Sequence, residues 1–212
     1  TILIVEDSAD MRFFISALLS GGYHCETAKD GLEGYEKSKE FVPDLIISDL
    51  MMPNLDGFEF TKYIRENELT CHIPIIMLTA KIDDNTRIQS WSHLVDDFMA
   101  KPFTNEELIA RVANLLSIRN NITNSFMSSS NEKDSNPFLL CNSEFYTERD
   151  RRFFEKFVDW MEKNYFDEKV NRKQAAEALA VSERQLNRKL VALVKTSFSD
   201  LLKKYRLSVA KK

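Results

Sequence analysis

The stretch LIISDLMMPNLDG, residues 45–57, decides the fold predicted for the first half of the chain. It opens on a short apolar run, Leu45–Ser48, of the kind expected for a strand that is covered on both faces. Ile2–Val5 and Ile75–Leu78 are two more runs of this kind. Fully covered strands are typical of parallel sheets, so these three runs predict the centre of such a sheet.

Two weaker strand candidates, His24–Ala28 and Asp97–Ala100, are expected nearer the edges of the sheet. Helical patterns lie between the strands, at about residues 10–20, 31–40, 57–67, 83–93 and 105–119. Five strands alternating with five helices predict an α/β fold, a doubly wound parallel sheet with helices on both faces.

The charge of the chain is divided unevenly between its two halves. Residues 1–118 hold 20 acidic and 10 basic side chains, whereas residues 119–212 hold 13 acidic and 19 basic ones. An acidic half joined to a basic half suggests two tasks, with nucleic acid as a candidate partner of the basic half. We expect three segments: a first domain at 1–119, a linker rich in Ser and Asn at 120–143, and an all-helical domain at 144–212.

No apolar run approaches the roughly 20 residues needed to span a bilayer, and the first residues carry no signal-peptide pattern. We therefore expect a cytoplasmic protein without membrane contact. The three cysteines have no metal-binding spacing, which favours reduced thiols.

Polar side chains follow four of the predicted strands, at the point where each strand ends. They are Glu6 and Asp7, Asp49, Thr79 and Lys101. Because the carboxyl ends of parallel strands meet at one edge of a sheet, we expect these side chains to converge. A lone aspartate after a strand is usually a helix cap or a solvated turn, but its occurrence together with the others favours a site.

The chemistry of this cluster follows from its residue types. Carboxylates packed close together repel one another unless a cation joins them, and a few hard oxygen ligands suit Mg²⁺. A metal beside Asp49 would neutralise an incoming phosphoryl group, while Lys101 and Thr79 could hold its other oxygens. Asp49 is then the candidate nucleophile, forming an acyl phosphate.

Four motifs resemble the signatures of the response-regulator receiver family, and together they cover nearly all of residues 1–119. They are Val5-Glu6-Asp7-Ser8, Asp49-Leu50-Met51-Met52-Pro53-Asn54-Leu55-Asp56-Gly57, Leu78-Thr79-Ala80-Lys81 and Asp96-Asp97-Phe98-Met99-Ala100-Lys101-Pro102-Phe103. The resemblance implies a flavodoxin-like fold. It also implies that Asp49 accepts a phosphoryl group from a histidine kinase, on a separate or on the same polypeptide, and loses it by slow self-dephosphorylation.

The resemblance further implies a ligand set for Mg²⁺: Asp7, Asp49 and the main-chain carbonyl of Met51, with Glu6 acting through water. A phosphatase that uses such an aspartate usually carries a second acid two residues on. Met51 stands at that place, which argues against turnover as the main function.

Phosphate binding and switching are implied for three further residues. Thr79 and Lys101 would bind the phosphoryl group, and Thr79 would move toward it while Phe98 rotates. The last strand and the last two helices would form the output face, through which a receiver homodimer could form.

In the basic half, two capping patterns predict a pair of short helices. Asn171-Arg172-Lys173-Gln174 begins the first, and Ser182-Glu183-Arg184-Gln185 begins the second, which reaches about Val194. Leu186, Leu190 and Leu193 would line the buried face of the second helix. Two helices joined by a short turn predict a helix-turn-helix.

The solvent face of the second helix would then show Arg184, Asn187, Arg188 and Lys195. Arginine and asparagine are residue types that suit base reading in the major groove. The basic residues Lys189, Lys203, Lys204 and Arg206 could neutralise phosphates. Short helix pairs are common and basic faces are often merely solvated, so this pattern alone leaves DNA binding open.

Residues from about 148 to 212 resemble the first part of an AraC-type DNA-binding module, on the following motifs: Ala175-Ala176, Leu179, Ser182, Leu186-Asn187-Arg188-Lys189-Leu190, Leu201-Leu202, Tyr205-Arg206-Leu207 and Ala210. Lys195 stands where that family usually has Gly. The family module carries two helix-turn-helix units, and this chain is expected to hold only one of them with part of the connecting helix.

The sequence therefore predicts a two-component response regulator whose phosphorylation controls sequence-specific DNA binding, free-standing or as the C-terminal part of a hybrid two-component protein. The alternative is a phosphorelay or protein-interaction module within a hybrid histidine kinase, without direct DNA binding by this segment. Steep salt dependence of binding would discriminate DNA from a protein partner.

Overall fold

The computed structural model of the chain describes residues 1–80, 94–128 and 147–210, with the backbone alone for 118–128. It divides into two compact units, Thr1–Ile118 and Arg119–Lys212. The expected helix at 83–93 lies outside the described residues. No helix of the described part is long and apolar enough to cross a membrane.

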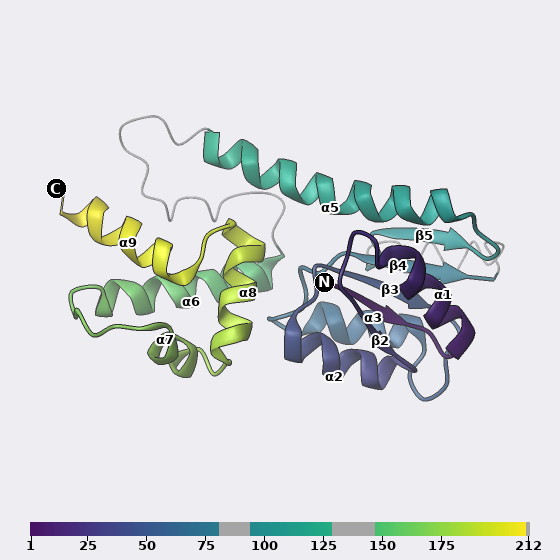
Figure 1. Cartoon of the computed structure of the whole chain (residues 1–212). Helices are drawn as coiled ribbons and strands as arrows, with labels where there is room; N and C mark the ends of the chain where they lie inside the picture. The colour runs from purple at the N-terminus through teal and green to yellow at the C-terminus, as the bar shows by residue number, and fades with distance from the viewer. Residues whose placement is uncertain (81–93, 129–146, 211–212) are drawn as a thin grey trace. The chain divides into compact units, whose positions relative to one another are not determined.

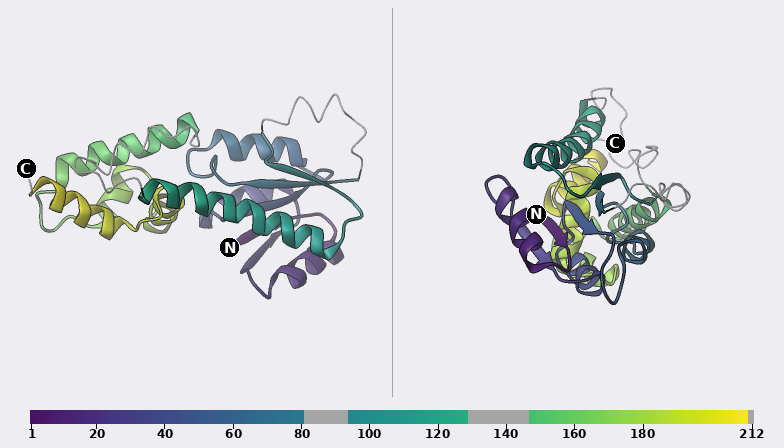
Figure 2. Two further views of the ribbon diagram at one scale, coloured as in Figure 1. Left: turned by 90° about the horizontal axis from the view of Figure 1, so that it is seen from above. Right: turned by 90° about the vertical axis from the view of Figure 1, so that its right-hand side faces the viewer.

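The first unit is built on a parallel sheet of five strands, as predicted, and their order is β2-β1-β3-β4-β5 (Figures 1 and 2). The two weaker strand candidates, β2 and β5, form its edges. The elements follow one another as β1 (Ile2–Val5), α1 (Ala9–Leu19), β2 (Cys25–Ala28), α2 (Gly31–Phe41), β3 (Leu45–Asp49), α3 (Gly57–Glu66), β4 (Ile75–Thr79), β5 (Asp97–Ala100) and α5 (Asn105–Ser128).

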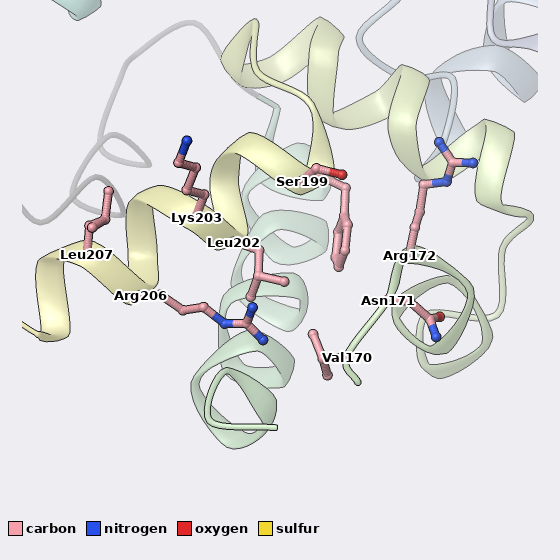
Figure 3. Close-up of a pocket in the computed structure, with 9 residues that line it drawn as sticks. Val170, Asn171, Arg172, Ser199, Leu202, Lys203, Arg206 and Leu207 are labelled. Carbon is pink, nitrogen blue, oxygen red and sulfur yellow. The ribbon is translucent and has the colours of Figure 1, made fainter. Parts of the chain in front are cut away.

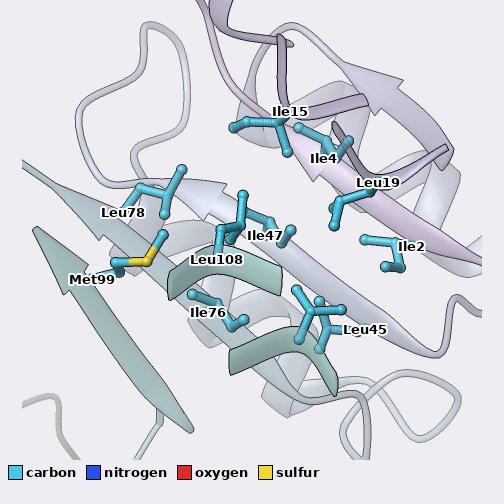
Figure 4. Close-up of a cluster of buried hydrophobic side chains, with 11 residues drawn as sticks. Ile2, Ile4, Ile15, Leu19, Leu45, Ile47, Ile76, Leu78, Met99 and Leu108 are labelled. Carbon is cyan, nitrogen blue, oxygen red and sulfur yellow. The ribbon is translucent and has the colours of Figure 1, made fainter. Parts of the chain in front are cut away.

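Each face of the sheet has its own apolar core, because successive strand residues point to opposite faces. Ile2 and Ile4 of β1 belong to the cluster under α1 and α5, which Figure 4 shows, together with Ile15 of α1 and Leu108 of α5. Leu3 and Val5, with their side chains on the other face, belong to the cluster under α2 and α3. The central strands are therefore apolar throughout, which is why they read as continuous runs in the sequence.

Helix α5 differs from its prediction at its end. The sequence predicts a helix that stops near residue 119 and a linker that begins at 120, whereas the helix continues to Ser128. No Gly or Pro occurs between residues 105 and 128, so nothing in the backbone chemistry ends the helix where the composition becomes polar.

The described part of the second unit is all-helical, as predicted. Its helices after the linker are α6 (Glu148–Asn164), α7 (Arg172–Ala178), α8 (Glu183–Val194) and α9 (Phe198–Val209). Both predicted capping boxes are present: Asn171 with Gln174 begins α7, and Ser182 with Gln185 begins α8. Thr147 caps α6 in the same way, with Asp150 as its partner.

The turn between α8 and α9 forms with Lys195 at a helix-end position where glycine is generally preferred. Lys195 has a φ of 50°, in the left-handed region, and its N–H donates to the carbonyl of Val191 at 3.0 Å. A side chain in this conformation costs about 1–2 kcal/mol. Ser197 then caps α9. The turn is therefore present in spite of the backbone strain at Lys195.

Candidate functional site

Strand register brings the predicted polar residues to one edge of the sheet. Val5 lies opposite Ser48, so Glu6 follows β1 at the level of Asp49, the last residue of β3. Thr79 ends β4 opposite Ala100, and Lys101 follows directly. The convergence expected from the four strand ends is therefore present in the fold.

The Lys101 ammonium links two of the carboxylates. Its Nζ lies 2.7 Å from Oε2 of Glu6 and 2.9 Å from Oδ1 of Asp49. The Glu6 side chain is 3% exposed and that of Asp49 is 10% exposed, while Lys101 is 20% exposed. The two nearly buried carboxylates thus share one ammonium, which compensates part of the cost of burying their negative charge.

Asp7 completes an acidic cluster with these two residues. One carboxylate oxygen from each of Glu6, Asp7 and Asp49 lies within 4.8 Å of the others, and Asp7 is exposed. Three carboxylates carry more negative charge than one ammonium balances, and oxygen donors of this kind fit a hard divalent cation. The donor set therefore fits Mg²⁺.

Burial and neighbouring charges shift the pKa values of Glu6 and Lys101. Burial raises the pKa of Glu6, the nearby charge of Asp49 raises it further, and the bond from Lys101 opposes both. Burial acts to lower the pKa of Lys101, but its bonds to Glu6 and Asp49 outweigh burial and leave that pKa raised. Lys101 therefore stays positively charged throughout the neutral range.

Arg12 fixes the loop that carries the acidic pair. Its Nη1 donates to the main-chain carbonyl of Glu6 at 2.6 Å and to that of Asp7 at 2.8 Å. Ser8, the N-cap of α1, donates its N–H to Oε1 of Glu6 at 3.3 Å. The sequence reasoning missed Arg12, since an arginine in a first helical turn carries no distinctive signal.

The loop after Asp49 is held on both sides. At Gly57 an added Cβ would lie 2.4 Å from the Asp49 carbonyl oxygen, so α3 starts in direct contact with the peptide of Asp49. Asn54, with a φ of 67°, donates to Oδ2 of Asp30 at 2.9 Å. Met51, two residues after Asp49, is 72% exposed.

The remaining predicted residues lie on the two strands beside this loop. Thr79 is buried, and its main-chain carbonyl accepts from the N–H of Lys101 at 2.7 Å. Phe98 is half-buried on the edge strand β5. The peptide bond between Lys101 and Pro102 is cis. The roles of Thr79 and Lys101 in phosphate binding, and of Thr79 and Phe98 in switching, remain predictions.

Residues 2–113 match the family model of the response regulator receiver domain. The chain belongs to the response regulator receiver family. Its receiver is 47% identical over 118 residues to hybrid signal transduction histidine kinase D of Dictyostelium discoideum. It is 41% identical over 117 residues to the phosphate regulon transcriptional regulatory protein PhoB of Pseudomonas aeruginosa. These alignments cover 56% and 55% of the chain, but only 8% and 51% of the relatives.

One relative matches beyond the receiver. Histidine kinase P4 of Formosa agariphila is 30% identical over 210 residues, which is 99% of this chain and 15% of that protein. The similarity thus includes the helical unit, and the chain spans a small part of that relative's length.

Solved receivers share the fold. The receiver domain of a sensor histidine kinase from Pseudomonas aeruginosa PAO1, with a magnesium ion coordinated in its active site cleft, is 32% identical and covers 55% of this chain and 96% of its own, with a TM-score of 0.51. The chemotaxis protein CheY4 of Vibrio cholerae is 34% identical over 54% of this chain and 96% of its own, also with a TM-score of 0.51.

Outside the receiver, the predicted base-reading residues lie on α8. Arg184 is exposed, whereas Asn187 and Arg188 are half-buried. Oδ1 of Asn187 accepts from the N–H of Phe198 at 3.4 Å, which connects α8 to the start of α9. Two of the three residues are therefore partly covered within the helical unit.

Two residues expected to neutralise phosphates make contacts within the helical unit. Lys189 is fully buried and pairs with Asp150 of α6. Arg206 donates to the main-chain carbonyls of Tyr165 and Asp167, at 2.8 and 2.7 Å. The expectation was wrong for Lys189, because its position three residues after Leu186 lies within the apolar stripe of α8.

A groove of about 460 Å³ lies beside Arg206, between α9 and the segment that begins α7. Figure 3 shows Leu202 and Val170 facing each other across it, with the guanidinium of Arg206 between α9 and α6. Lys203 and Leu207 lie farther along α9. The groove combines apolar walls with a cation that is already bonded to the main chain.

Proposed function

We propose that the chain is the receiver and output segment of a two-component system, in which Asp49 accepts a phosphoryl group from a histidine kinase. The observation that carries this proposal is the Lys101 ammonium, 2.9 Å from Asp49 and 2.7 Å from Glu6 at the carboxyl edge of the sheet. A nucleophilic carboxylate and a cation for the phosphoryl oxygens thus stand side by side.

In the transfer step, a carboxylate oxygen of Asp49 attacks phosphorus, the bond from phosphorus to the kinase imidazole breaks, and the imidazole leaves with the bonding electrons and takes up a proton. Lys101 is positioned to pair with a phosphoryl oxygen, and the Thr79 hydroxyl to donate to another. Water at the exposed rim then hydrolyses the acyl phosphate slowly, returning Asp49 to its carboxylate. The chain is thus a phosphoacceptor rather than an enzyme with turnover.

Asp7, Asp49 and the main-chain carbonyl of Met51 would hold Mg²⁺, with Glu6 acting through water. The bound ion would supply positive charge against the phosphoryl oxygens. The acidic cluster and the magnesium site of the related sensor-kinase receiver support this assignment. Arg12 contributes by holding the carbonyls of Glu6 and Asp7, which keeps both carboxylates in place.

For output, we propose that phosphorylation changes the positions of Thr79 and Phe98 and thereby receiver dimerisation, which controls DNA binding by the helical unit. The AraC-type helix-turn-helix would be α7 and α8, with Arg184, Asn187 and Arg188 on its reading helix. The two capping boxes and the four-residue connection between these helices support this assignment.

A second candidate function is supported by the similarity of the whole chain to histidine kinase P4. In this case the segment belongs to a hybrid kinase polypeptide, and the phosphoryl group comes from the same protein. The helical unit would then contact either DNA or a protein. The salt dependence of binding distinguishes a DNA partner from a protein partner. Binding to DNA weakens steeply with salt because counterions are released from the phosphates.

The phosphoacceptor is tested with the full chain, Mg²⁺ and a small phosphodonor such as acetyl phosphate. Asp49→Asn should abolish labelling. The matched control is Asp44→Asn, an exposed carboxylate just before the other end of β3, which pairs with the N-terminus and should leave labelling unchanged. Undiminished labelling of Asp49→Asn would refute the site assignment.

DNA binding is tested by titrating the phosphorylated chain against a random-sequence duplex pool at several salt concentrations. Lys204→Ala, at an exposed lysine of α9, should weaken binding to all sequences and reduce the salt slope by about one unit, because one ammonium no longer neutralises a phosphate. Binding that does not respond to salt would favour the protein-interaction candidate.

A further inference from the structure

A buried ion pair joins the first turn of α6 to the middle of α8. Nζ of Lys189 donates to Oδ1 of Asp150, and the two side chains are 0% and 1% exposed. The other oxygen of the same carboxylate, Oδ2, accepts from the Thr147 N–H at 3.1 Å and from its hydroxyl at 2.8 Å. One carboxylate therefore ties the N-cap of α6, where the helical bundle begins, to the helix that carries Arg184 and Arg188.

Stability alone does not account for this pair. Lysine is almost never fully buried unless it is paired, and taking two charges out of water costs so much that apolar replacements of similar volume are often equally stable or more stable. The rest of the buried face of α8 is apolar, made of Leu186, Leu190, Leu193 and Val194. Apolar packing of that kind is non-directional, so it permits small rotations and shifts of a helix.

The ion pair, unlike the apolar contacts, fixes the rotation of α8 about its own axis. Successive residues of an α-helix are about 100° apart around its axis, since 3.6 residues make one turn. Holding Lys189 against Asp150 therefore sets the direction in which its neighbour Arg188 leaves the helix, and that of Arg184 one turn earlier. The centroid of the Phe153 ring lies 5.8 Å from Lys189 Nζ, so the ring restricts the position of the ammonium from a second side.

We propose that Asp150 and Lys189 are positioning residues that fix the rotation of α8 and thereby determine which DNA sequences the helix discriminates. The inference rests on the proposed DNA-binding function. Contacts to phosphates tolerate a misoriented helix because they are sequence-independent, whereas contacts to base edges do not. The pair accordingly governs discrimination between duplexes more than total affinity.

The experiment compares the full chain with the double variant Asp150→Leu/Lys189→Met, which replaces the pair by apolar side chains of similar length. Arg151→Met is the matched control, because its partners Glu148 and Glu155 form exposed pairs on the same helix. Two quantities are measured on each chain: hydrogen exchange of the α8 amides, and the affinity ratio for a duplex selected by the wild type against a scrambled duplex.

With the melting temperature of the double variant near that of the wild type, we expect exchange in α8 to accelerate about tenfold and the affinity ratio to fall about tenfold. The control should change neither. Unchanged exchange and an unchanged ratio in the double variant would overturn the proposal. A wild type that does not discriminate between duplexes, combined with faster α8 exchange in the variant, would refute DNA reading and leave the positioning of α8 supported.

Thr147→Val keeps the proposal testable if the double variant does not fold. It removes the hydroxyl that donates to Oδ2 of Asp150 and leaves the ion pair in place. We expect exchange in α8 to accelerate about threefold, since one of several bonds to the carboxylate is lost. Exchange in α8 equal to that of the wild type, together with faster exchange confined to the first turn of α6, would contradict the connection between the two helices.

Discussion

Removing the Lys101 ammonium tests the electrostatics of the receiver site most severely. In Lys101→Met the nearly buried carboxylates of Glu6 and Asp49 lose the cation that they share. Each charge-assisted bond is worth about 1.5–3 kcal/mol, and part of this is offset because the partly buried ammonium no longer has to be desolvated. We expect a net loss of about 3 kcal/mol in the free energy of unfolding of the receiver at pH 7.

The sign of the pH dependence follows from Glu6. Its pKa is already raised by burial, and it rises further without Lys101, whose bond lowers it. A carboxyl with a raised folded pKa opposes folding when it is ionised, above both its folded and its unfolded values. The penalty in Lys101→Met is therefore largest at neutral pH. It shrinks as the pH falls through the raised pKa toward the unfolded value of 4.5.

Hydrogen exchange of the peptides that cover β1 and β3 measures this penalty within the full chain. A loss of about 3 kcal/mol corresponds to roughly 100-fold faster exchange at pH 7, after correction for intrinsic rates, and the excess should be smaller at pH 5. Lys62→Met, a substitution of an exposed lysine on α3, is the control. Exchange equal to that of the wild type, or an excess that does not depend on pH, would refute the reasoning.

Substitutions at three further positions test other parts of the structure. Arg12→Ala removes two hydrogen bonds from the acidic loop, so Mg²⁺ affinity measured by calorimetric titration should fall about tenfold, with Arg12→Lys in between. Gly57→Ala places a Cβ 2.4 Å from the Asp49 carbonyl oxygen, and thermal unfolding should show a loss of about 1–3 kcal/mol. Lys195→Gly relieves a left-handed φ of 50° and should stabilise the helical unit by about 1 kcal/mol in the same assay; no gain would contradict the strain assigned to this turn.

Much of the receiver could be predicted because its signals are local. The central strands are apolar on both faces, and their ends carry the polar residues, so the division into central and edge strands and the edge that holds the site follow from general rules for parallel sheets. The register of β1 against β3 then places Glu6 beside Asp49 without further information. The bond from Arg12 to the two loop carbonyls was not predictable, because main-chain acceptors leave no pattern in the sequence.

The helical unit was predicted less completely, and Lys189 shows why. A lysine on a basic helix favours solvent exposure, and its partner Asp150 lies 39 residues away in the sequence. One signal was available: Lys189 follows Leu186 by three residues and precedes Leu193 by four, which is the spacing of the buried stripe. The extension of α5 to Ser128 was missed for a different reason, since polar composition does not end a helix.

The central claim is that Asp49 becomes an acyl phosphate, and locating the modification tests it most directly. The full chain is phosphorylated with acetyl phosphate and Mg²⁺, reduced with borohydride, which converts a phosphoaspartate to homoserine, and digested for mass spectrometry. We predict the change at residue 49 alone, and its loss when Mg²⁺ is removed. Homoserine at Asp7 or at any other aspartate, with residue 49 left unmodified, would contradict the account.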